Sequence, residues 1–246
     1  MKLVSINIES NLHTETVLNL LKEEKPDVIC MQEMLEEDFE LYRSVFNFNG
    51  MYKSQLYIGQ HHVNSHLAGK RHGVAIFSKN IINSGYEYYV GSEENVSQSY
   101  EEYFSDNKFQ ENRVLVWCDI LDSNKNVFRF CTTHFTITKK GESTPKQFAD
   151  LDLLFKALEP LGEFILCGDM NAPRGNETFT RLANKYKDNI PLEYKTSIDQ
   201  NLHRVKGIMF MVDGLFTTPK YEASNVKLVD GVSDHMAIVA EIEKIL

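Results

Sequence analysis

The chain has 246 residues, of which 42% are hydrophobic, and its formal net charge at pH 7 is -9. This composition is typical of a soluble protein with a sizeable core, and it excludes an intrinsically disordered or membrane-spanning chain. The negative charge also disfavours a broad basic surface for duplex DNA, although carboxylates that recruit cations can reverse the field locally. No Pro/Gly/Ser-rich stretch marks a linker, so residues 1–246 are expected to form a single domain.

The first elements are predicted to be a strand, a helix and a second strand. Apolar and polar residues alternate over residues 2–8, as they do in a strand. Apolar residues then recur at helical spacing over residues 14–24, before Pro26. Residues 27–31 form a short apolar run that is typical of a buried strand. A right-handed crossover between the two strands would bring Asn7 and Glu33 to one edge of a sheet.

The rest of the chain alternates between strand and helix patterns. Further helices are expected over residues 36–46, 144–158 and 177–186. Further strands are expected over residues 51–58, 73–78, 86–91, 114–120, 127–133, 164–168, 208–216, 224–229 and 236–242. Residues 92–107 are polar and acidic without periodicity, which favours a long surface loop. This order predicts an α/β fold with two packed, mixed β-sheets flanked by helices, a four-layer α/β sandwich.

The cysteines and the start of the chain indicate a reducing compartment. Each of the four cysteines lies within an apolar run that predicts a buried strand, and none has the close spacing of a metal-ligand pair. The first strand follows Met1 directly, without a signal segment. We therefore expect free thiols packed in the core, a cytoplasmic location, no insertion into a membrane and a monomeric protein.

A carboxylate and an amide follow one of the predicted buried strands. Asp169 and Asn171 come two residues apart after an apolar run, so their side chains point to the same side. An aspartate in this place can orient or deprotonate a water, and the neutral amide can donate to a phosphate oxygen. The alternative is a turn in which both residues only cap the following helix.

Two other strand ends carry residues suited to a cation or a phosphate. Glu33 ends an apolar strand, where an ionised carboxylate is costly unless it meets a cation. The alternative for Glu33 is emergence into solvent. Asp234 and His235 stand just before the last strand, where they can hold a divalent cation and donate to a phosphoryl oxygen. A loop aspartate beside a partly exposed histidine is the alternative there.

Taken in chain order, these motifs resemble those of the endonuclease/exonuclease/phosphatase superfamily. The segments that carry the resemblance are Ser5-Ile6-Asn7-Ile8, Gln32-Glu33, Gly73-Val74-Ala75-Ile76-Phe77-Ser78-Lys79, Arg113-Val114, Thr133-His134-Phe135, Gly168-Asp169-Met170-Asn171-Ala172-Pro173, Val212-Asp213-Gly214-Leu215-Phe216 and Ser233-Asp234-His235. They extend over essentially the whole chain. The resemblance implies a deoxyribonuclease I-like fold and the hydrolysis of a phosphate ester.

The resemblance also implies a role for each matching residue. Glu33 is similar to the principal Mg²⁺ ligand of the family, for which Mn²⁺ can substitute, and Asn7 and Asp234 to residues that help to hold the metal or its waters. Asp169 corresponds to the residue that positions or activates the attacking water. The residues that would bind the scissile phosphate are His134, Asn171 and His235, and Asp213 would orient His235.

Two features of the motifs distinguish branches of the family. Gly214 and Met211 stand where members often carry an aromatic or basic residue and an arginine, so the rim near Asp213 is less basic than usual. His134 matches the branches of deoxyribonuclease I, sphingomyelinases, phosphatases and the second type of tyrosyl-DNA phosphodiesterase. Abasic-site endonucleases usually have a tyrosine there, which makes them a less favoured relationship.

Several further residues are candidates for the substrate rim or for substrate contacts. The candidates for substrate binding are Lys70, Arg71, Arg113, Asp199 and Asn201. The histidines of one short stretch, for which a solvated or phosphate-facing loop is favoured over a zinc site, are His61, His62, His66 and His72. The aromatic residues that can either stack bases or pack within the fold are Tyr86, Tyr88, Tyr89, Tyr100, Tyr103 and Phe104.

The favoured function is therefore Mg²⁺-dependent hydrolysis of a phosphodiester in nucleic acid, at short or single-stranded ends or at an end adduct. The net charge of -9 supports a substrate that contacts few phosphates. The alternative is a phosphatase or phosphodiesterase for a phospholipid, an inositol phosphate or another small phosphorylated metabolite, against which the absence of an apolar docking hairpin speaks mildly. An inactive binding module on the same fold is the remaining alternative.

Overall fold

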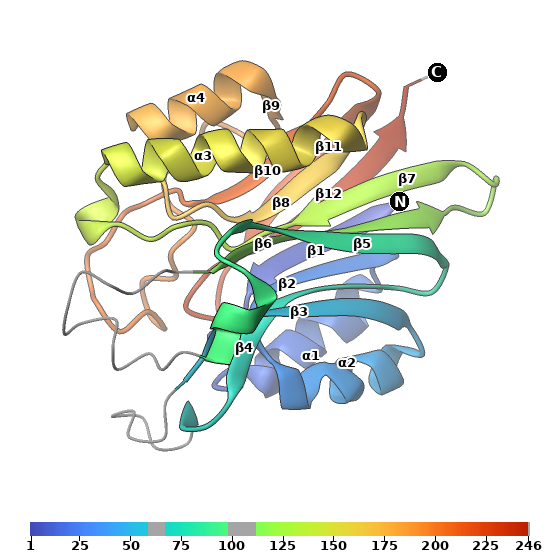
Figure 1. Cartoon of the computed structure of the whole chain (residues 1–246). Coiled ribbons are helices and arrows are strands. Elements are labelled where there is room, and N and C mark those ends of the chain that lie inside the picture. Colours follow the sequence, from blue (N-terminus) through green and yellow to red (C-terminus); the bar gives the residue numbers. More distant parts are fainter. Residues whose placement is uncertain (59–66, 98–111, 246) are drawn as a thin grey trace.

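The computed structural model describes residues 1–58, 67–97 and 112–245, and within them the chain forms two six-stranded β-sheets (Figure 1). The strands of the first sheet are ordered β11 (Tyr221–Val229), β12 (Ala237–Lys244), β1 (Lys2–Asn7), β2 (Val28–Leu35), β4 (Arg71–Ser78) and β3 (Asn49–Tyr57). Those of the second are ordered β5 (Ile81–Val90), β6 (Arg113–Leu121), β7 (Val127–Thr132), β8 (Ile165–Asp169), β10 (Asp213–Thr217) and β9 (Lys187–Asp188). Both sheets are mixed, because β1 is parallel to β2 and β7 is parallel to β8.

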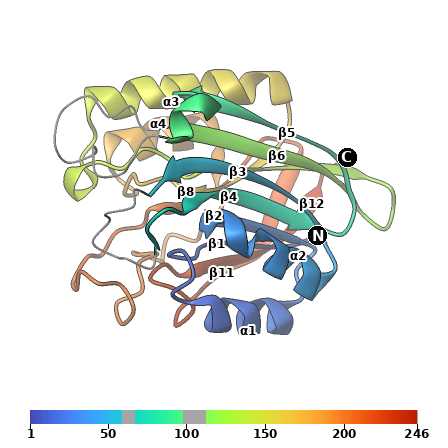
Figure 2. The same ribbon diagram turned by 60° about the horizontal axis from the view of Figure 1, so that its bottom comes forward.

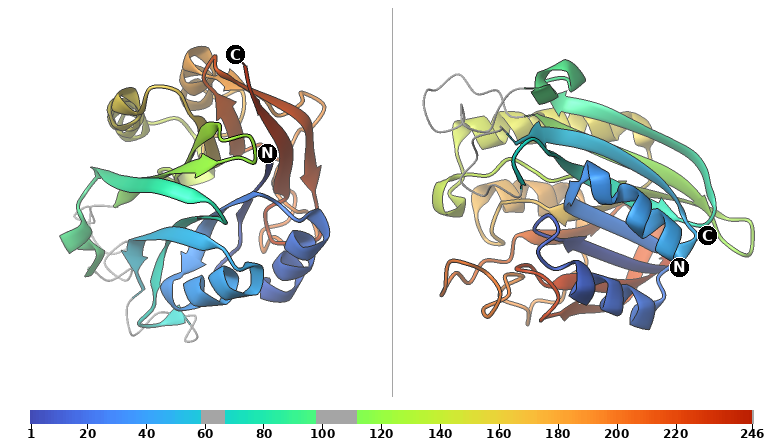
Figure 3. Two further views of the ribbon diagram at one scale, coloured as in Figure 1. Left: turned by 90° about the vertical axis from the view of Figure 1, so that its right-hand side faces the viewer. Right: turned by 90° about the horizontal axis from the view of Figure 1, so that it is seen from below.

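Helices cover the outer faces of the two sheets. The first sheet is covered by α1 (Thr14–Glu24) and α2 (Phe39–Phe46), which come forward together in Figure 2. The second sheet is covered by α3 (Pro145–Leu158) and α4 (Glu177–Lys185), and the layers are seen edge-on in Figure 3. Short 3₁₀ turns occur at η1 (Glu36–Asp38), η3 (Glu93–Ser97), η5 (Lys139–Gly141) and η6 (Glu159–Leu161).

Local sequence signals account for the helix positions. In α1, Val17, Leu20 and Leu21 recur at helical spacing and are buried against the first sheet. In α3, the Thr144 hydroxyl accepts a hydrogen bond from the Gln147 amide, and Pro145 occupies the first turn, where its missing N–H is tolerated. The sequence therefore accounts for the face that α1 buries and for the residue at which α3 begins.

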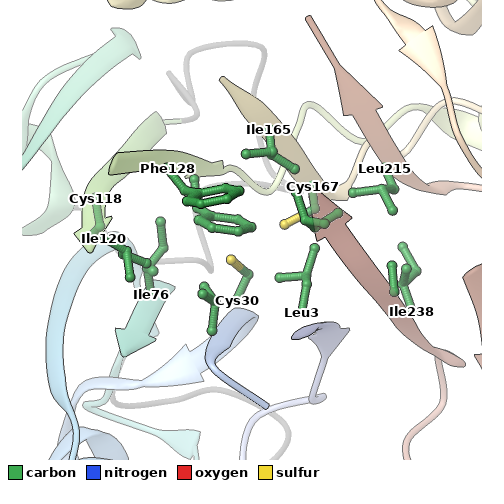
Figure 4. Packing of buried hydrophobic residues seen from close by; sticks show 14 of the residues in the cluster. Leu3, Cys30, Ile76, Cys118, Ile120, Phe128, Ile165, Cys167, Leu215 and Ile238 are labelled. Carbon is green, nitrogen blue, oxygen red and sulfur yellow. The ribbon is translucent and has the colours of Figure 1, made fainter. Parts of the chain in front are cut away.

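The central core lies between the two sheets, with a further apolar layer beneath each pair of helices. Figure 4 shows the central layer, in which Leu3 and Cys30 of the first sheet meet Cys167 and Leu215 of the second. Side chains alternate along each strand, so Val4 faces the opposite way and packs beneath the helices of the first sheet. This alternation decides which residues face inward at the end of every strand.

The structure confirms the expected α/β sandwich and corrects some element boundaries. Only residues 213–216 of the strand expected over 208–216 are strand, and β10 continues to Thr217; the Ser197 hydroxyl accepts hydrogen bonds from the backbone N–H groups of Val212 and Asp213 where the strand begins. The helix expected from residue 36 begins as a 3₁₀ turn, and the short β9 was not anticipated. The segment 92–107 starts with η3, and its residues 98–107 lie outside the described part of the chain.

Two expectations about the core and the membrane can be compared with the structure. The four cysteines are buried and free, as expected, at Cys30, Cys118, Cys131 and Cys167. Burial raises the pKa of Cys30, Cys118 and Cys131 above that of an exposed thiol. Within the described residues, no helix is long and apolar enough to cross a membrane.

Gly168, next to Asp169, stands where the second sheet leaves no room for a side chain, and this can be tested. Its φ is 144°, and a Cβ atom there would lie 2.1 Å from the carbonyl oxygen of Thr133. Gly168→Ala should lower the free energy of unfolding by on the order of 3 kcal/mol, measured by urea denaturation, because strain and overlap add. Gly231→Ala, at φ 70° with nothing within 4 Å, is the matched control and should cost about 1 kcal/mol. Equal losses in the two variants would contradict this account of Gly168.

Candidate active site

Polar residues occupy the inward-facing positions where several strands reach the same edge of the sandwich. Leu3 and Cys167 lie in the central core, and alternation along β1 and β8 then turns Asn7 and Asp169 inward as well. The same alternation beyond β7 turns His134 inward, and Asp213 precedes the inward-facing Leu215 in β10. Strand geometry alone therefore brings two acids, an amide and an imidazole together.

Glu33 reaches this edge through an irregularity in β2. The pairing of β2 with β4 shifts register between Met31 and Met34, and Glu33 has a φ of 58°. The bulge turns the Glu33 carboxylate toward the other sheet, where regular alternation from the inward-facing Cys30 would point it to the helices. Such a backbone conformation is costly for a residue with a side chain and is typical of functional sites.

The side chain of Asn7 links the two sheets at the site. Its Nδ2 donates to Oε1 of Glu33 at 3.1 Å and to Oδ2 of Asp169 at 3.2 Å. Its Oδ1 accepts a hydrogen bond from the backbone N–H of Glu9. Asn7 is buried, so its amide fixes both carboxylates without adding charge.

Two histidines flank the Asp169 carboxylate. Nε2 of His134 lies 3.4 Å from Oδ2 of Asp169, and Nε2 of His235 lies 3.9 Å from the same oxygen. Burial acts to raise the pKa of Asp169, but the hydrogen bond from His134 and the charge of His235 outweigh it, and the pKa is lowered. The side chain of Asp169 is 3% exposed and that of His134 is 14% exposed, so His134 is the residue of this pair that faces the solvent.

Asp213 and His235 form a buried pair. Nδ1 of His235 lies 2.7 Å from Oδ2 of Asp213, a geometry that fixes the ring and leaves Nε2 directed at Asp169. Burial acts to lower the pKa of His235, but the charges of Asp213 and Asp169 raise it well above the value of a free imidazole. Burial also raises the pKa of Asp213, and His235 opposes that shift.

Asn171 is held in the same constellation by backbone contacts. Its N–H donates to Oδ1 of Asp169 at 2.8 Å, and its Nδ2 donates to the carbonyl of Phe135 at 3.0 Å. The buried Gln147 of α3 supports this loop from behind, because its Nε2 donates to the carbonyls of Thr136 and Asn171. Asp169 and Asn171, which are two residues apart in the sequence, therefore fix each other's position through this hydrogen bond.

A cavity of about 790 Å³ opens over these residues. The predicted site residues that line it are Glu33, His134, Asp169, Asn171, Asp234 and His235. Asn7 and Asp213 are buried behind it and contact its lining. Burial, together with the charges of Glu33 and Glu9, raises the pKa of Asp234 to about 7, against the opposing effect of His235.

The predicted basic residues are distributed differently. Arg113 lines the cavity, and its Nη1 donates to the carbonyl of His134 at 3.3 Å. Lys70 forms an ion pair with Glu37 at 2.5 Å, and Arg71 lies 3.7 Å from Glu36. Neither Lys70 nor Arg71 lines the cavity, so the structure does not bring these two side chains to the site.

The remaining candidates lie outside the cavity lining. The Asp199 carboxylate accepts hydrogen bonds from the backbone N–H groups of Asn201, Leu202 and Gly231, and Asn201 is exposed. Tyr88 donates to the carbonyl of Ser54, and Tyr86 packs beneath Lys53. The predicted rim and stacking residues that lie outside the described part of the chain are His61, His62, His66, Tyr100, Tyr103 and Phe104.

Some cavity residues lie where the sequence did not place them. His72 was expected on a solvated or phosphate-facing loop, but it lies in β4 and lines the cavity, with Nε2 3.2 Å from the Ser10 hydroxyl and 3.6 Å from Oε2 of Glu33. Its position directly before the motif that begins at Gly73 was a signal for this placement. The other unassigned polar residues of the lining include Glu9, Gln55, Lys139, Lys140, His203 and Arg204. Most of these residues lie outside the strands, where the periodicity of the sequence does not predict which side chains face the cavity.

Fold and site together define a phosphoesterase-type α/β sandwich. The chain belongs to the Endonuclease/Exonuclease/phosphatase family, whose sequence profile matches residues 4–235. Members of this family are generally hydrolases that act on phosphate esters. No curated protein sequence matches the chain.

Solved structures share the fold at low sequence identity. The human Nocturnin catalytic domain, solved with a bound sulfate anion, superposes with a TM-score of 0.74 at 15% identity, covering 100% of this chain and 93% of that one. The mannosyl-6-phosphatase Bt3783 of Bacteroides thetaiotaomicron gives 0.68 at 14% identity, with 99% of each chain covered. A D. rerio TDP2 humanised by 14 mutations gives 0.66 at 14% identity, again with 99% of each chain covered.

The Asp213–His235 pair can be tested as a unit. His235→Ala should lower the turnover of a chromogenic phosphodiester by about 10²–10³-fold, because a preorganised donor is lost. Asp213→Ala should produce a loss of similar size, since the ring is no longer oriented, and the double variant should lose little more. Steady-state kinetics of the four proteins measures the coupling, and losses that multiply fully would show that the two residues act independently.

Proposed function

We propose that this protein hydrolyses a phosphodiester with the help of a bound divalent cation, Mg²⁺ or Mn²⁺. The observation that carries the proposal is the convergence of Asn7, Glu33, Asp169, His134 and His235 from both sheets on one cavity. Acids, amides and imidazoles in this arrangement suit a reaction in which a water must be placed and negative charge on phosphoryl oxygens must be neutralised.

The chemistry of the donors fits a hard cation. Glu33 and Asp234 offer carboxylate oxygens, which Mg²⁺ and Mn²⁺ prefer as ligands, and Asn7 helps to hold the site by donating its Nδ2 to Glu33. A second group of potential ligand atoms, in Asp169, Asp213 and His235, lies within 4.8 Å of one another. Asp213 and His235 already bind each other, so we assign the cation to the Glu33 side of the cavity. A cation there also offsets the repulsion between Glu33, Asp234 and Glu9.

Different side chains carry out different parts of the proposed reaction. Asp169 positions the attacking water, because its carboxylate is fixed by Asn7, by the Asn171 backbone and by His134. His134 and His235 direct their Nε2 atoms toward Asp169, where they can bind the phosphoryl oxygens, and Asn171 lines the cavity beside Asp169. The bound cation supplies charge neutralisation at the phosphate and the leaving oxygen.

Two classes of substrate agree with parts of the cavity. The first is a short or single-stranded nucleic-acid end, which is supported by the basic residues Arg113, Lys139, Lys140 and Arg204 in the lining. The second is a phospholipid, an inositol phosphate or another small phosphorylated compound. This second class is supported by the aliphatic residues of the lining, Leu12, Ile58, Leu67, Ile137, Val205 and Ile208. We also propose that the protein acts in the cytoplasm and as a monomer.

Removing the cation should abolish hydrolysis. EDTA should reduce turnover to the uncatalysed rate, and Mg²⁺ or Mn²⁺ should restore it. Glu33→Gln should raise the Mg²⁺ concentration needed for half-maximal activity by at least about tenfold, because a ligand charge is lost. The apparent melting temperature with and without Mg²⁺ gives a readout besides activity, and the variant should lose the Mg²⁺-dependent rise. Undiminished hydrolysis in excess chelator would refute the proposed cation dependence.

Changing Asp169 should affect turnover more than substrate binding. Asp169→Asn should lower kcat by about 10²–10⁴-fold with little change in KM, because the group acts on the attacking water in the transition state. Asp150→Asn is a matched control, since Asp150 is another buried aspartate, hydrogen-bonded to Thr136 and Lys146 away from the cavity lining. A near-normal kcat for Asp169→Asn would remove Asp169 from the mechanism.

A panel of substrates decides between the two classes. Single-stranded DNA, duplex DNA, RNA, a 5′-tyrosyl oligonucleotide, sphingomyelin and inositol phosphates should be compared in one Mg²⁺ buffer. A nucleic-acid enzyme should prefer single-stranded ends and show a shallow salt dependence, because few phosphates are contacted. Turnover confined to lipid or inositol phosphates would exclude the nucleic-acid class.

A further inference from the structure

Exposed aliphatic side chains gather around the mouth of the cavity. We call residues 137–141 and 200–210 the mouth loops. They contain Ile137, Val205 and Met209, whose exposed fractions are 51%, 53% and 55%, and Leu202 at 37%. Leu12, at 54%, lines the same cavity from the end of β1. These five residues are a large share of the twelve exposed large hydrophobic residues in the described part of the chain.

The two mouth loops lie side by side. A side chain placed at Gly141 would lie 3.5 Å from the ring of Phe210, and both residues line the cavity. Ile137 and Val205 line it as well, while Met209 stands between the lining residues Ile208 and Phe210. The exposed residues Leu12, Ile137 and Val205 therefore share one opening, and Met209 lies on the same loop between two lining residues.

The mouth loops carry a charge opposite to that of the whole protein. Their charged residues are Lys139, Lys140, Arg204 and Lys206, and they contain no Asp or Glu. The complete chain has a formal net charge of -9. Arg204 lies 4.0 Å from Glu9, and Lys206 donates to the carbonyl of Asn201. The mouth loops thus combine exposed aliphatic side chains with positively charged ones.

This combination distinguishes between anionic partners. Unpaired bases stack on aromatic faces, but the exposed side chains of the mouth loops are aliphatic, and Phe210 is partly buried. Aliphatic side chains among lysines and arginines are the pattern that enters the headgroup region of an anionic bilayer, where the basic residues meet lipid phosphates. The stems of the lysines can lie against apolar surface while their charges stay in water.

We propose that the mouth loops dock the protein onto an anionic phospholipid surface, with the cavity facing the bilayer. Ile137, Val205 and Met209 enter between headgroups, and Lys139, Lys140, Arg204 and Lys206 bind the lipid phosphates. The inference goes beyond the proposed hydrolysis, because it concerns where the protein is held. Binding to vesicles requires neither a cation nor turnover, so either proposal can fail without the other.

Co-sedimentation with vesicles in EDTA tests the docking. The full chain should bind vesicles of phosphatidylcholine with one quarter phosphatidylserine, should bind pure phosphatidylcholine far more weakly, and should dissociate at high salt. Ile137→Asp combined with Met209→Asp should lower the partition coefficient by at least about tenfold. Lys206→Gln should lower it by about fivefold. Matched controls are Ile82→Asp, at 55% exposed on β5, and Lys22→Gln on α1, and both should bind like the unchanged protein.

Three results would overturn the proposal. They are no binding of the unchanged protein to anionic vesicles, equal binding by the mouth-loop variants and their controls, or tighter binding to a single-stranded oligonucleotide that the same variants abolish. The third result would make the mouth loops a nucleic-acid surface. Thermal unfolding checks that each variant is folded. If an aspartate variant is unfolded, Ile137→Ser with Met209→Ser replaces it, and the same fall in vesicle binding is required.

Discussion

The whole structure depends on one constraint, the face-to-face packing of two sheets whose side chains alternate. Along each central strand the inward positions carry apolar residues such as Leu3 and Cys167, and these exclude water from the space between the sheets. At one edge the same inward positions become Asn7 and Asp169. The candidate active site is therefore the polar end of the core, and any change in strand register that disturbed the core would also turn its residues outward.

Burial at that edge explains why the polar residues are so closely coupled. A carboxylate that is removed from water needs a cation or hydrogen-bond donors, and Asp169 has donors from Asn7, the Asn171 backbone and His134. Asn7 serves Glu33 and Asp169, while His235 lies between Asp213 and Asp169. The imidazoles of His72 and His134 lie 3.6 and 3.8 Å from Glu33, and together with Asn7 they lower its pKa against the effect of burial. The carboxylate that is not compensated is Asp234, whose pKa is raised by burial and by the charges of Glu33 and Glu9, and its charge is the physical reason for assigning a divalent cation to this side of the cavity.

The sequence predicts the parts of the protein that obey strand periodicity. Alternation and motif order were sufficient for the sandwich and for the sheet edge that Asn7 and Glu33 share. The place of Glu33 follows from its motif, but its orientation depends on a bulge that no pattern in β2 announces. Lys70 and Arg71 could not be placed from the sequence either, because their partners Glu37 and Glu36 come from a distant turn. His72 and the mouth loops become site residues only when separate segments fold together.

Residues proposed for the reaction lie on strands or directly after them, whereas residues proposed to contact the substrate lie on loops. Structures that share this fold at 14–15% identity include a mannosyl-6-phosphatase and the Nocturnin catalytic domain, so the architecture alone does not select a substrate. The residues closest to Asp169 stand on strands or directly after them, where packing fixes their geometry. The mouth loops are free of that packing, and their aliphatic and basic residues can change without disturbing the core. Selection among phosphate esters must therefore reside in the loops, and here the loops surround a phosphate-directed centre with apolar and positively charged groups.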